Sequence, residues 1–235
     1  MRRATLTLGA VVAILCLPAV AMAQWSENFD GYTSGTVLDN IGGWAGWDNN
    51  PAAAGTVSDR QSLSNPNSIV VSQSFGEDAV HPFSGYTSGN WTFTAHQYIP
   101  SGLNGITYFI INNEYNHGGP YQWAIETHMT SATGMVNEQT RDPNGANATP
   151  IIYDEWVEIR TEIDLDANTM EHFYGGTMIA SGAWNSSGTS IAIANVDLYA
   201  PHAEPVHYDN LSIVPEPTSI LLLSLGAIGL VRRRR

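Results

Sequence analysis

The stretch EWVEIRTEIDLDANTMEHFYGG, residues 155–176, decides the fold. Apolar residues recur at every second position along its first half, at Val157, Ile159 and Ile163. A period of two is typical of a strand that buries one face. The run 166–168 then supplies turn residues, and a second alternating run ends at the glycine pair 175–176. The stretch therefore predicts a strand, a tight turn and a returning strand.

Similar runs continue on the N-terminal side. WTFTAHQYIPSG, residues 91–102, places one set of side chains on one strand face (Trp91, Phe93, Ala95, Gln97 and Ile99) and another set on the opposite face (Thr92, Thr94, His96 and Tyr98). GITYFIINNEY and YQWAIETHM read as two further strands, separated by a break at residues 118–120. No stretch between residues 24 and 214 keeps a helical period. Many short strands with regular turn signals predict an all-β, antiparallel two-sheet sandwich over residues 24–214.

The charge of the chain restricts its partners. The 235 residues carry a net charge of −13, and there is no lysine. Between residues 24 and 214 the only basic side chains are Arg60, Arg141 and Arg160, against 21 acidic ones, a net charge of −18. Such a surface repels phosphate backbones, so we expect no nucleic-acid partner.

The N-terminus has the layout of a secretory signal peptide. Residues 1–23 combine a basic start, an apolar centre and the small-residue run Ala21-Met22-Ala23, which predicts a signal helix cleaved after Ala23. An uncleaved membrane anchor is the alternative. Cys16 lies inside this segment, so the mature chain would hold no cysteine and no disulfide.

The C-terminus, VPEPTSILLLSLGAIGLVRRRR, has an unusual order of parts. Pro215, Glu216 and Pro217 precede an apolar run of 14 residues, which is short beside the roughly 20 that span a bilayer, and four arginines follow. This order resembles the PEP-CTERM sorting signal of Gram-negative bacteria. The resemblance implies a short hydrophobic helix within residues 215–235, recognition by an exosortase, and transient residence in the inner membrane. It also implies delivery to the cell surface or extracellular matrix, whereas an ordinary C-terminal anchor is the alternative.

The central region also has a family resemblance. The strand-turn-strand stretch, together with ENFDGY (27–32) and VHYDNLSI (206–213), resembles concanavalin A-like and laminin-G-like jelly rolls. The resemblance implies that the last two stretches are the first and last strands of a sandwich. Lectins, glycanases and adhesion modules share that fold, so fold alone does not choose a function.

One stretch raises the question of catalysis. Glu162, Asp164 and Asp166 alternate along one strand face, and laminarinase-type glucanases of this fold carry a similar acidic strand whose first and last acids are nucleophile and acid/base. Here the last acid is an aspartate that enters a turn. Since a solvated strand face accounts for the same pattern, we expect no catalytic residue in this set. No Ser-His-Asp set, P-loop or dinucleotide motif can be assigned.

Aromatic and amide residues suggest carbohydrate binding instead. GGWAGWDNNP places Trp44 and Trp47 in a glycine-rich loop before Asn49 and Asn50. Sugars stack on aromatic rings and donate hydroxyl hydrogen bonds to amides and carboxylates. A second set would line a groove on one sheet: His96, Tyr98, Glu126 and His128. The alternatives are buried tryptophans and a plain solvated face.

Metal binding is the last question. The histidines lack the spacing of a zinc site. Calcium suits an acidic exported protein, and Glu27, Asp30 and Asp209 lie on the expected first and last strands, which a jelly roll brings together. A carboxylate cluster without metal is the alternative.

These observations predict an exported, surface-sorted jelly roll that binds extracellular polysaccharide or matrix without cleaving it. Two alternatives stay open: a structural surface protein without a small ligand, and a divergent laminarinase-like glycanase.

Overall fold

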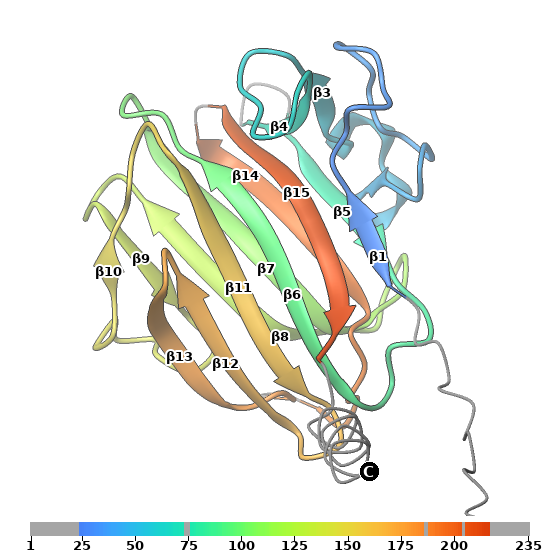
Figure 1. Ribbon diagram of the computed structural model, residues 1–235, viewed down its shortest axis with the longest axis vertical. Coiled ribbons are helices and arrows are strands. Elements are labelled where there is room, and N and C mark those ends of the chain that lie inside the picture. Colours follow the sequence, from blue (N-terminus) through green and yellow to red (C-terminus); the bar gives the residue numbers. More distant parts are fainter. Residues whose placement is uncertain (1–23, 73–75, 186–187, 204, 217–235) are drawn as a thin grey trace, which may run out of the picture.

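The protein is a sandwich of two antiparallel β-sheets packed face to face (Figure 1). The computed structural model describes residues 24–72, 76–185, 188–203 and 205–216. This architecture confirms the predicted all-β sandwich. The expected signal helix and C-terminal hydrophobic helix lie outside the described residues. Within the described part, no helix has the length and apolar character needed to cross a membrane.

The first sheet, called sheet A, holds eight strands in the order β13-β12-β11-β6-β15-β4-β3, with β1 also paired to β15. Their bounds are β1 (Trp25–Glu27), β3 (Thr56–Ser58), β4 (Ser68–Val71), β6 (Asn90–Tyr98), β11 (Trp156–Asp164), β12 (Thr169–Tyr174), β13 (Thr177–Ala183) and β15 (Val206–Pro215).

The second sheet, called sheet C, holds seven strands in the order β10-β9-β8-β7-β14-β5-β2. Their bounds are β2 (Ala45–Gly46), β5 (Asp78–Pro82), β7 (Gly105–Tyr115), β8 (Tyr121–Thr130), β9 (Met135–Glu138), β10 (Thr149–Pro150) and β14 (Asn195–Ala203). Two 3₁₀ turns follow β2, η1 (Trp47–Asn49) and η2 (Pro51–Ala53).

The hairpin predicted from residues 155–176 is present as β11 and β12. Its turn places Asn168 at φ +56°, a left-handed conformation that asparagine tolerates better than most residues. The Asp164 carboxylate accepts a hydrogen bond from the Ala167 amide at 2.7 Å and closes the turn. Gly175 and Gly176, at φ +55° and +79°, then reverse the chain into β13.

The core lies between the inner faces of the two sheets. On β6, Trp91, Phe93 and Ala95 are buried, as the alternation predicts. Phe93 packs edge-on against Phe109 of sheet C, with ring centroids 5.9 Å apart. Gln97 is buried too, and its amide donates to the Tyr208 hydroxyl at 2.6 Å.

A buried histidine links the two sheets. His172 of β12 lies within hydrogen-bond distance of Thr161 Oγ1 on β11 (2.9 Å) and of Thr127 Oγ1 on β8 (2.8 Å). Complete burial is the main cause that lowers the pKa of His172 to about 3, so the ring is neutral. A neutral imidazole has one donor and one acceptor nitrogen, which the two threonine hydroxyls can satisfy.

The described chain begins and ends side by side. Trp25 pairs with Ile213 and Glu27 with Leu211, so β1 lies along the second half of β15 (Figure 1). The predicted juxtaposition of the first and last strands is confirmed, but the first strand ends at Glu27, and residues 28–32 of the stretch ENFDGY form a turn.

Candidate functional site: an aromatic cleft on sheet C

The outer face of sheet C carries a cleft of about 590 Å³, which we call the aromatic cleft. It crosses β8, β7, β14 and β5 and is bordered by η1. Its lining combines aromatic rings, one aliphatic side chain and three acids: Trp47, Asp78, Tyr108, Ile110, Tyr121, Trp123, Glu126, Asp197 and Tyr199.

Two groups of rings form the walls. Trp47 packs on Tyr121 with ring centroids 4.8 Å apart. It lies nearly parallel to Trp123, with a centroid distance of 6.5 Å and an interplanar angle of 19°. Across the cleft, Tyr108 and Tyr199 stack with a centroid distance of 5.4 Å and an interplanar angle of 27°. These five rings are neither fully buried nor fully exposed. Flat rings that remain accessible provide surfaces on which the C–H face of a sugar can stack.

The loop that carries Trp47 is tied to the β7–β8 turn. The Asp48 carboxylate accepts hydrogen bonds from the Gly118 amide (2.8 Å) and the Tyr121 hydroxyl (2.6 Å). The first of these bonds is the main cause that lowers the pKa of Asp48. In return, the Asp48 amide donates to the Tyr115 hydroxyl at 3.2 Å. These contacts hold Trp47 against β8, although the two segments lie far apart in the sequence.

Three acids sit among the rings. Asp78 projects from β5 and Asp197 from β14, on adjacent strands of the same outer face. Burial is the main cause that raises the pKa of Asp78 to about 6, and it raises the pKa of Asp197 well above its usual range. Glu126, on β8, has its carboxylate 3.1 Å from the His128 ring. The cleft therefore offers hydrogen-bond acceptors beside stacking surfaces.

A larger hollow of about 980 Å³ lies over β3 and β4 of sheet A. Hydroxyl side chains, valines, prolines and glycines dominate its lining, together with Arg60 and His207, and no tryptophan, tyrosine or phenylalanine takes part. It lacks a surface for sugar stacking, so the aromatic cleft is the stronger candidate for carbohydrate.

The residues of GGWAGWDNNP divide between core and cleft. Trp44 is fully buried and packs against Phe29 and His81, with ring centroids 5.6 and 5.3 Å away. The prediction that Trp44 contacts a ligand is therefore wrong, because the ring fills the end of the core. Trp47 does line the cleft. Asn49 and Asn50 are exposed beside it, and the Asn50 side chain accepts from the Ala52 amide at 3.2 Å, which caps η2.

The second predicted set does not form one groove. His96 and Tyr98 lie on β6 of sheet A, whereas Glu126 and His128 lie on β8 of sheet C. All four point outward, so the two pairs occupy opposite faces of the sandwich. The predicted groove is wrong because alternation reveals which residues share a strand face but not which sheet the strand joins. Of the four, only Glu126 lines the aromatic cleft.

Most of the cleft was missed by the sequence patterns. The alternation of β8 places Trp123 on the same face as the core residue Ile125. In the structure Ala124 and Ile125 are both buried, and the pairing of β7 with β8 shifts register there. A β-bulge of this kind moves the residues on one side of it to the other face. Trp123 therefore points outward, and no signal in the isolated strand shows the bulge.

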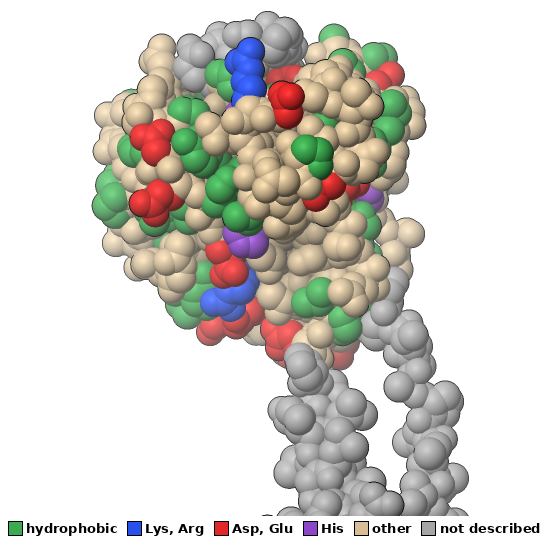
Figure 2. Space-filling view, turned by 45° about the horizontal axis from the view of Figure 1, so that its top comes forward, with side chains coloured by type: hydrophobic (Ala, Val, Ile, Leu, Met, Phe, Trp, Pro, Cys, Tyr) green, Lys and Arg blue, Asp and Glu red, His purple; other side chains and the backbone are tan. Residues whose placement is uncertain are grey.

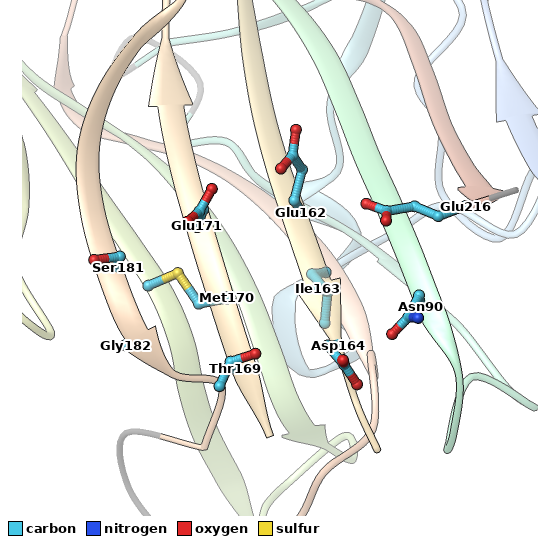
Figure 3. A pocket seen from close by; sticks show the side chains of 10 residues that line it. All are labelled: Asn90, Glu162, Ile163, Asp164, Thr169, Met170, Glu171, Ser181, Gly182 and Glu216. Atoms are coloured by element: carbon cyan, nitrogen blue, oxygen red, sulfur yellow. The ribbon is translucent and has the colours of Figure 1, made fainter. Parts of the chain in front are cut away.

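The acidic strand of sheet A forms a different site (Figure 3). Glu162 and Asp164 line a hollow of about 370 Å³ with Glu171 and Glu216. Glu162 pairs with Arg160, and Asp164 caps the β11–β12 turn. Asp166 is exposed on the turn and accepts from the Gly89 amide at 3.0 Å. These contacts support the interpretation that the three acids are solvated side chains at the end of a strand.

The three carboxylates predicted to hold calcium are bonded to protein donors. Asp209 accepts from the amides of Leu63 (2.7 Å) and Ser64 (2.9 Å). Glu27 accepts from the Phe29 amide and the Tyr32 hydroxyl, and Asp30 from the Asn67 amide. Within the described ranges, no group of three or more His, Cys, Asp or Glu side chains is arranged to hold a metal. Hydrogen-bond donors occupy the oxygens that a calcium ion would need, so these side chains do not fit the predicted site.

Comparison with solved structures agrees with the sandwich fold. A sialidase aligns over 83% of this chain and 19% of its own length, with a TM-score of 0.56 at 8% identity. Cellulose induced protein Cip1 aligns over 81% of this chain and 96% of its own length, with a TM-score of 0.50 at 16% identity. A mutant of alginate lyase Aly36B, solved with an alginate tetrasaccharide, aligns over 82% of this chain and 96% of its own length, with a TM-score of 0.52 at 13% identity. The chain thus spans about a fifth of the sialidase but nearly all of the other two, and identities this low show the fold alone.

Sequence comparison identifies the C-terminal tail. No curated protein matches the sequence. Residues 214–235 match the family model of the PEP-CTERM protein-sorting motif. Such a motif implies export, exosortase processing and surface association. The chain is therefore a jelly-roll sandwich, similar in fold to Cip1 and to an alginate lyase, that carries the PEP-CTERM sorting motif of exported proteins at its C-terminal end.

Proposed function

We propose that this chain is an exported, exosortase-sorted surface protein that binds extracellular polysaccharide in the aromatic cleft without cleaving it. One observation carries the proposal: rings from η1, β7, β8 and β14 meet three carboxylates on one outer sheet face. Rings supply stacking area, and carboxylates orient sugar hydroxyls, which is the combination that carbohydrate recognition requires.

A glycan array probed with residues 24–216 tests the proposal, because every strand of the described structure lies inside this range. Binding should fall at least about tenfold when Trp47 is changed to alanine, since a lost stacking ring is worth about 1.4 kcal/mol or more. Trp156→Ala is the matched control. Trp156 is also partly exposed and packs on a tyrosine, Tyr98 at 5.7 Å, but it lies on sheet A. Equal losses in both variants, or no glycan binding by the unmodified protein, would contradict the proposal.

Glycan cleavage in the same cleft is the second candidate. The Asp78–Asp197 pair favours it, because adjacent carboxyls with raised pKa values occur in acid–base catalysis. Release of reducing ends from a bound polysaccharide, lost in Asp197→Asn, would replace the binding proposal with this one. We expect no release, because the rings and acids cross an open sheet face on which nothing excludes water from a reacting bond.

A further inference from the structure

The Asp78–Asp197 pair is the most unusual feature of the aromatic cleft. In the antiparallel pairing of β5 and β14, Asp197 lies opposite Val80 and Tyr199 opposite Asp78, so the two acids are diagonal neighbours on the outer face. Asp197 is only 2% exposed, whereas Asp78 is partly accessible from the cleft. Asp78 is therefore the outer member of the pair, and Asp197 lies beneath it.

Each acid has an unused hydrogen-bond acceptor. Asp78 Oδ1 and Asp197 Oδ1 are both buried and accept no hydrogen bond from a described residue outside the pair, although the two carboxyl groups lie close enough to bond to each other when one of them is protonated. A buried polar atom without a partner costs about 1–3 kcal/mol. Because Asp197 also lines the cleft, a donor group of a ligand that reaches the pair would recover part of this cost.

The described residues around the pair provide no counter-ion. The titratable groups that act on it come from five elements: Asp48 of η1, Tyr115 of β7, Glu126 of β8, Tyr199 of β14 and Tyr208 of β15. None of them is a cation. The three arginines of the sandwich are engaged elsewhere: Arg60 at the hollow over β3 and β4, Arg141 against carbonyls at the end of β13, and Arg160 on the outer face of sheet A.

The charge state of the pair follows from burial. Burial raises the pKa of Asp78 to about 6 and raises the pKa of Asp197 well above its usual range, because the buried surroundings disfavour a negative charge on both carboxyl groups at once. Glu126 adds a third acidic side chain to the cleft. An anionic sugar such as a uronate would bring a further carboxylate to this site, and unbalanced like charges at an interface cost several kcal/mol. A protonated amine would instead supply donors and opposite charge together.

We propose that the aromatic cleft selects polysaccharides that contain amino sugars, and that the ligand's ammonium group donates hydrogen bonds to the Asp78–Asp197 pair. The inference rests on the proposed function, because the rings must hold the sugar chain for its amine to reach the acids. The expected ligand is therefore a glucosamine-type polymer and not a uronic acid polymer.

Three oligosaccharides of equal length test the proposal by calorimetry with residues 24–216: β-1,4-linked glucosamine, its N-acetylated form, and mannuronate. At about pH 6, where amines are charged, the glucosamine chain should bind at least about tenfold more tightly than the neutral N-acetylated chain. The mannuronate chain should bind most weakly. Equal affinity for the first two would overturn the selectivity and leave the cleft a general glycan site, and no binding of any of the three would also overturn the proposed function.

Two variants separate the pair from the overall negative charge of the protein. Asp78→Asn keeps the size of the side chain and should abolish the preference for glucosamine while binding of the N-acetylated chain remains, which also shows that the variant is folded. Glu162→Gln removes one charge from the acidic hollow of sheet A and should leave the preference unchanged. If both variants reduce glucosamine binding equally, attraction by net charge explains the binding and the proposal fails.

Discussion

Arg141 is a buried cation that bonds to both sheets. Its guanidinium donates to the Ala124 carbonyl of β8 in sheet C, and to the carbonyls of Ala183 and Trp184 at the end of β13 in sheet A. The Glu138 carboxylate lies 3.7 Å away and is fully buried. Burial is the main cause that lowers the pKa of Arg141 from its usual value, but the guanidinium stays protonated at neutral pH.

Replacing Arg141 should therefore destabilise the sandwich strongly. We expect Arg141→Met to lower the free energy of unfolding by about 3–5 kcal/mol, because it leaves the buried Glu138 carboxylate without its counter-ion and several backbone carbonyls without a donor. Arg160→Met is the matched control. Arg160 lies on the outer face of sheet A over the Phe173 ring, 4.1 Å from its centroid, and should cost about 1 kcal/mol or less. Urea unfolding of both variants measures the difference, and equal losses would contradict it.

At the scale of elements, the junction of β1 and β15 depends on carboxylates that accept hydrogen bonds. Asp209 accepts from Leu63, Ser64 and Asn210, which ties the loop before β4 to the last strand. Asp30 acts on Asp209 as a like charge, and burial is the main cause that raises the pKa of Asp209. These side chains anchor loops through amide donors.

Calcium should accordingly leave the stability of this junction unchanged. We expect the same melting temperature, within about 1 °C, for residues 24–216 in calcium and in chelator. Asp209→Ala should lower the melting temperature by about 4–12 °C in both, since charge-assisted hydrogen bonds worth about 2–3 kcal/mol are lost and each kcal/mol shifts a domain of this size by 2–4 °C. Asp166→Ala, which removes a single exposed acceptor, is the control. A melting temperature that rises with calcium and loses that rise in Asp209→Ala would restore the predicted metal site.

Strand identity was largely predictable from the sequence, whereas strand partners were not. Alternation in β6 and β11 correctly assigned Trp91, Phe93 and Ile163 to the core, because a period of two is a local property. Alternation alone would place Trp123 in the core, but the bulge beside Ala124 reverses the phase within the strand. Asp78 and Asp197 gave no signal, because their proximity comes from the pairing of strands more than a hundred residues apart. The cleft is thus a product of long-range pairing.

At the scale of the whole molecule, the sorting motif begins inside the folded domain. Pro215 is the last residue of β15 and lies opposite Trp91 of β6. The Glu216 amide donates to the Asn90 carbonyl at 3.0 Å, and its carboxylate accepts from the Thr92 hydroxyl at 3.2 Å. Figure 3 shows Glu216 reaching from the end of β15 over β6 toward β11. We expect the folded sheet to compete with an exosortase for the start of the motif.

We expect processing to cut the chain near residues 214–217 and remove the apolar tail. Intact-mass analysis of protein recovered from its native surface checks this expectation, and a mass that includes Arg232–Arg235 would contradict it. Thr92→Val removes one contact to Glu216 and should increase the processed fraction. Thr94→Val, two residues along the same strand face, is the control and should leave that fraction unchanged.

The acidity of the surface is also a whole-molecule property. Acidic side chains are scattered over the face seen in Figure 2, and basic ones are sparse there. The net charge of −18 between residues 24 and 214 keeps copies of the domain apart and repels anionic polymers. If the cleft binds glycans as proposed, long-range repulsion would disfavour anionic chains before they reach its rings.

The position of β15 has a mechanical consequence. The strand lies inside sheet A between β6 and β4, and its C-terminal end leads to the sorting motif, while the aromatic cleft lies on the other sheet. If the protein is held at its C-terminal end and pulled through a bound polymer, tension runs along β15. Its hydrogen bonds to β6 lie across that direction, so the load shears them together instead of opening them one at a time. A tether at this end of the chain would therefore resist stretching far better than one at β1, a strand of three residues.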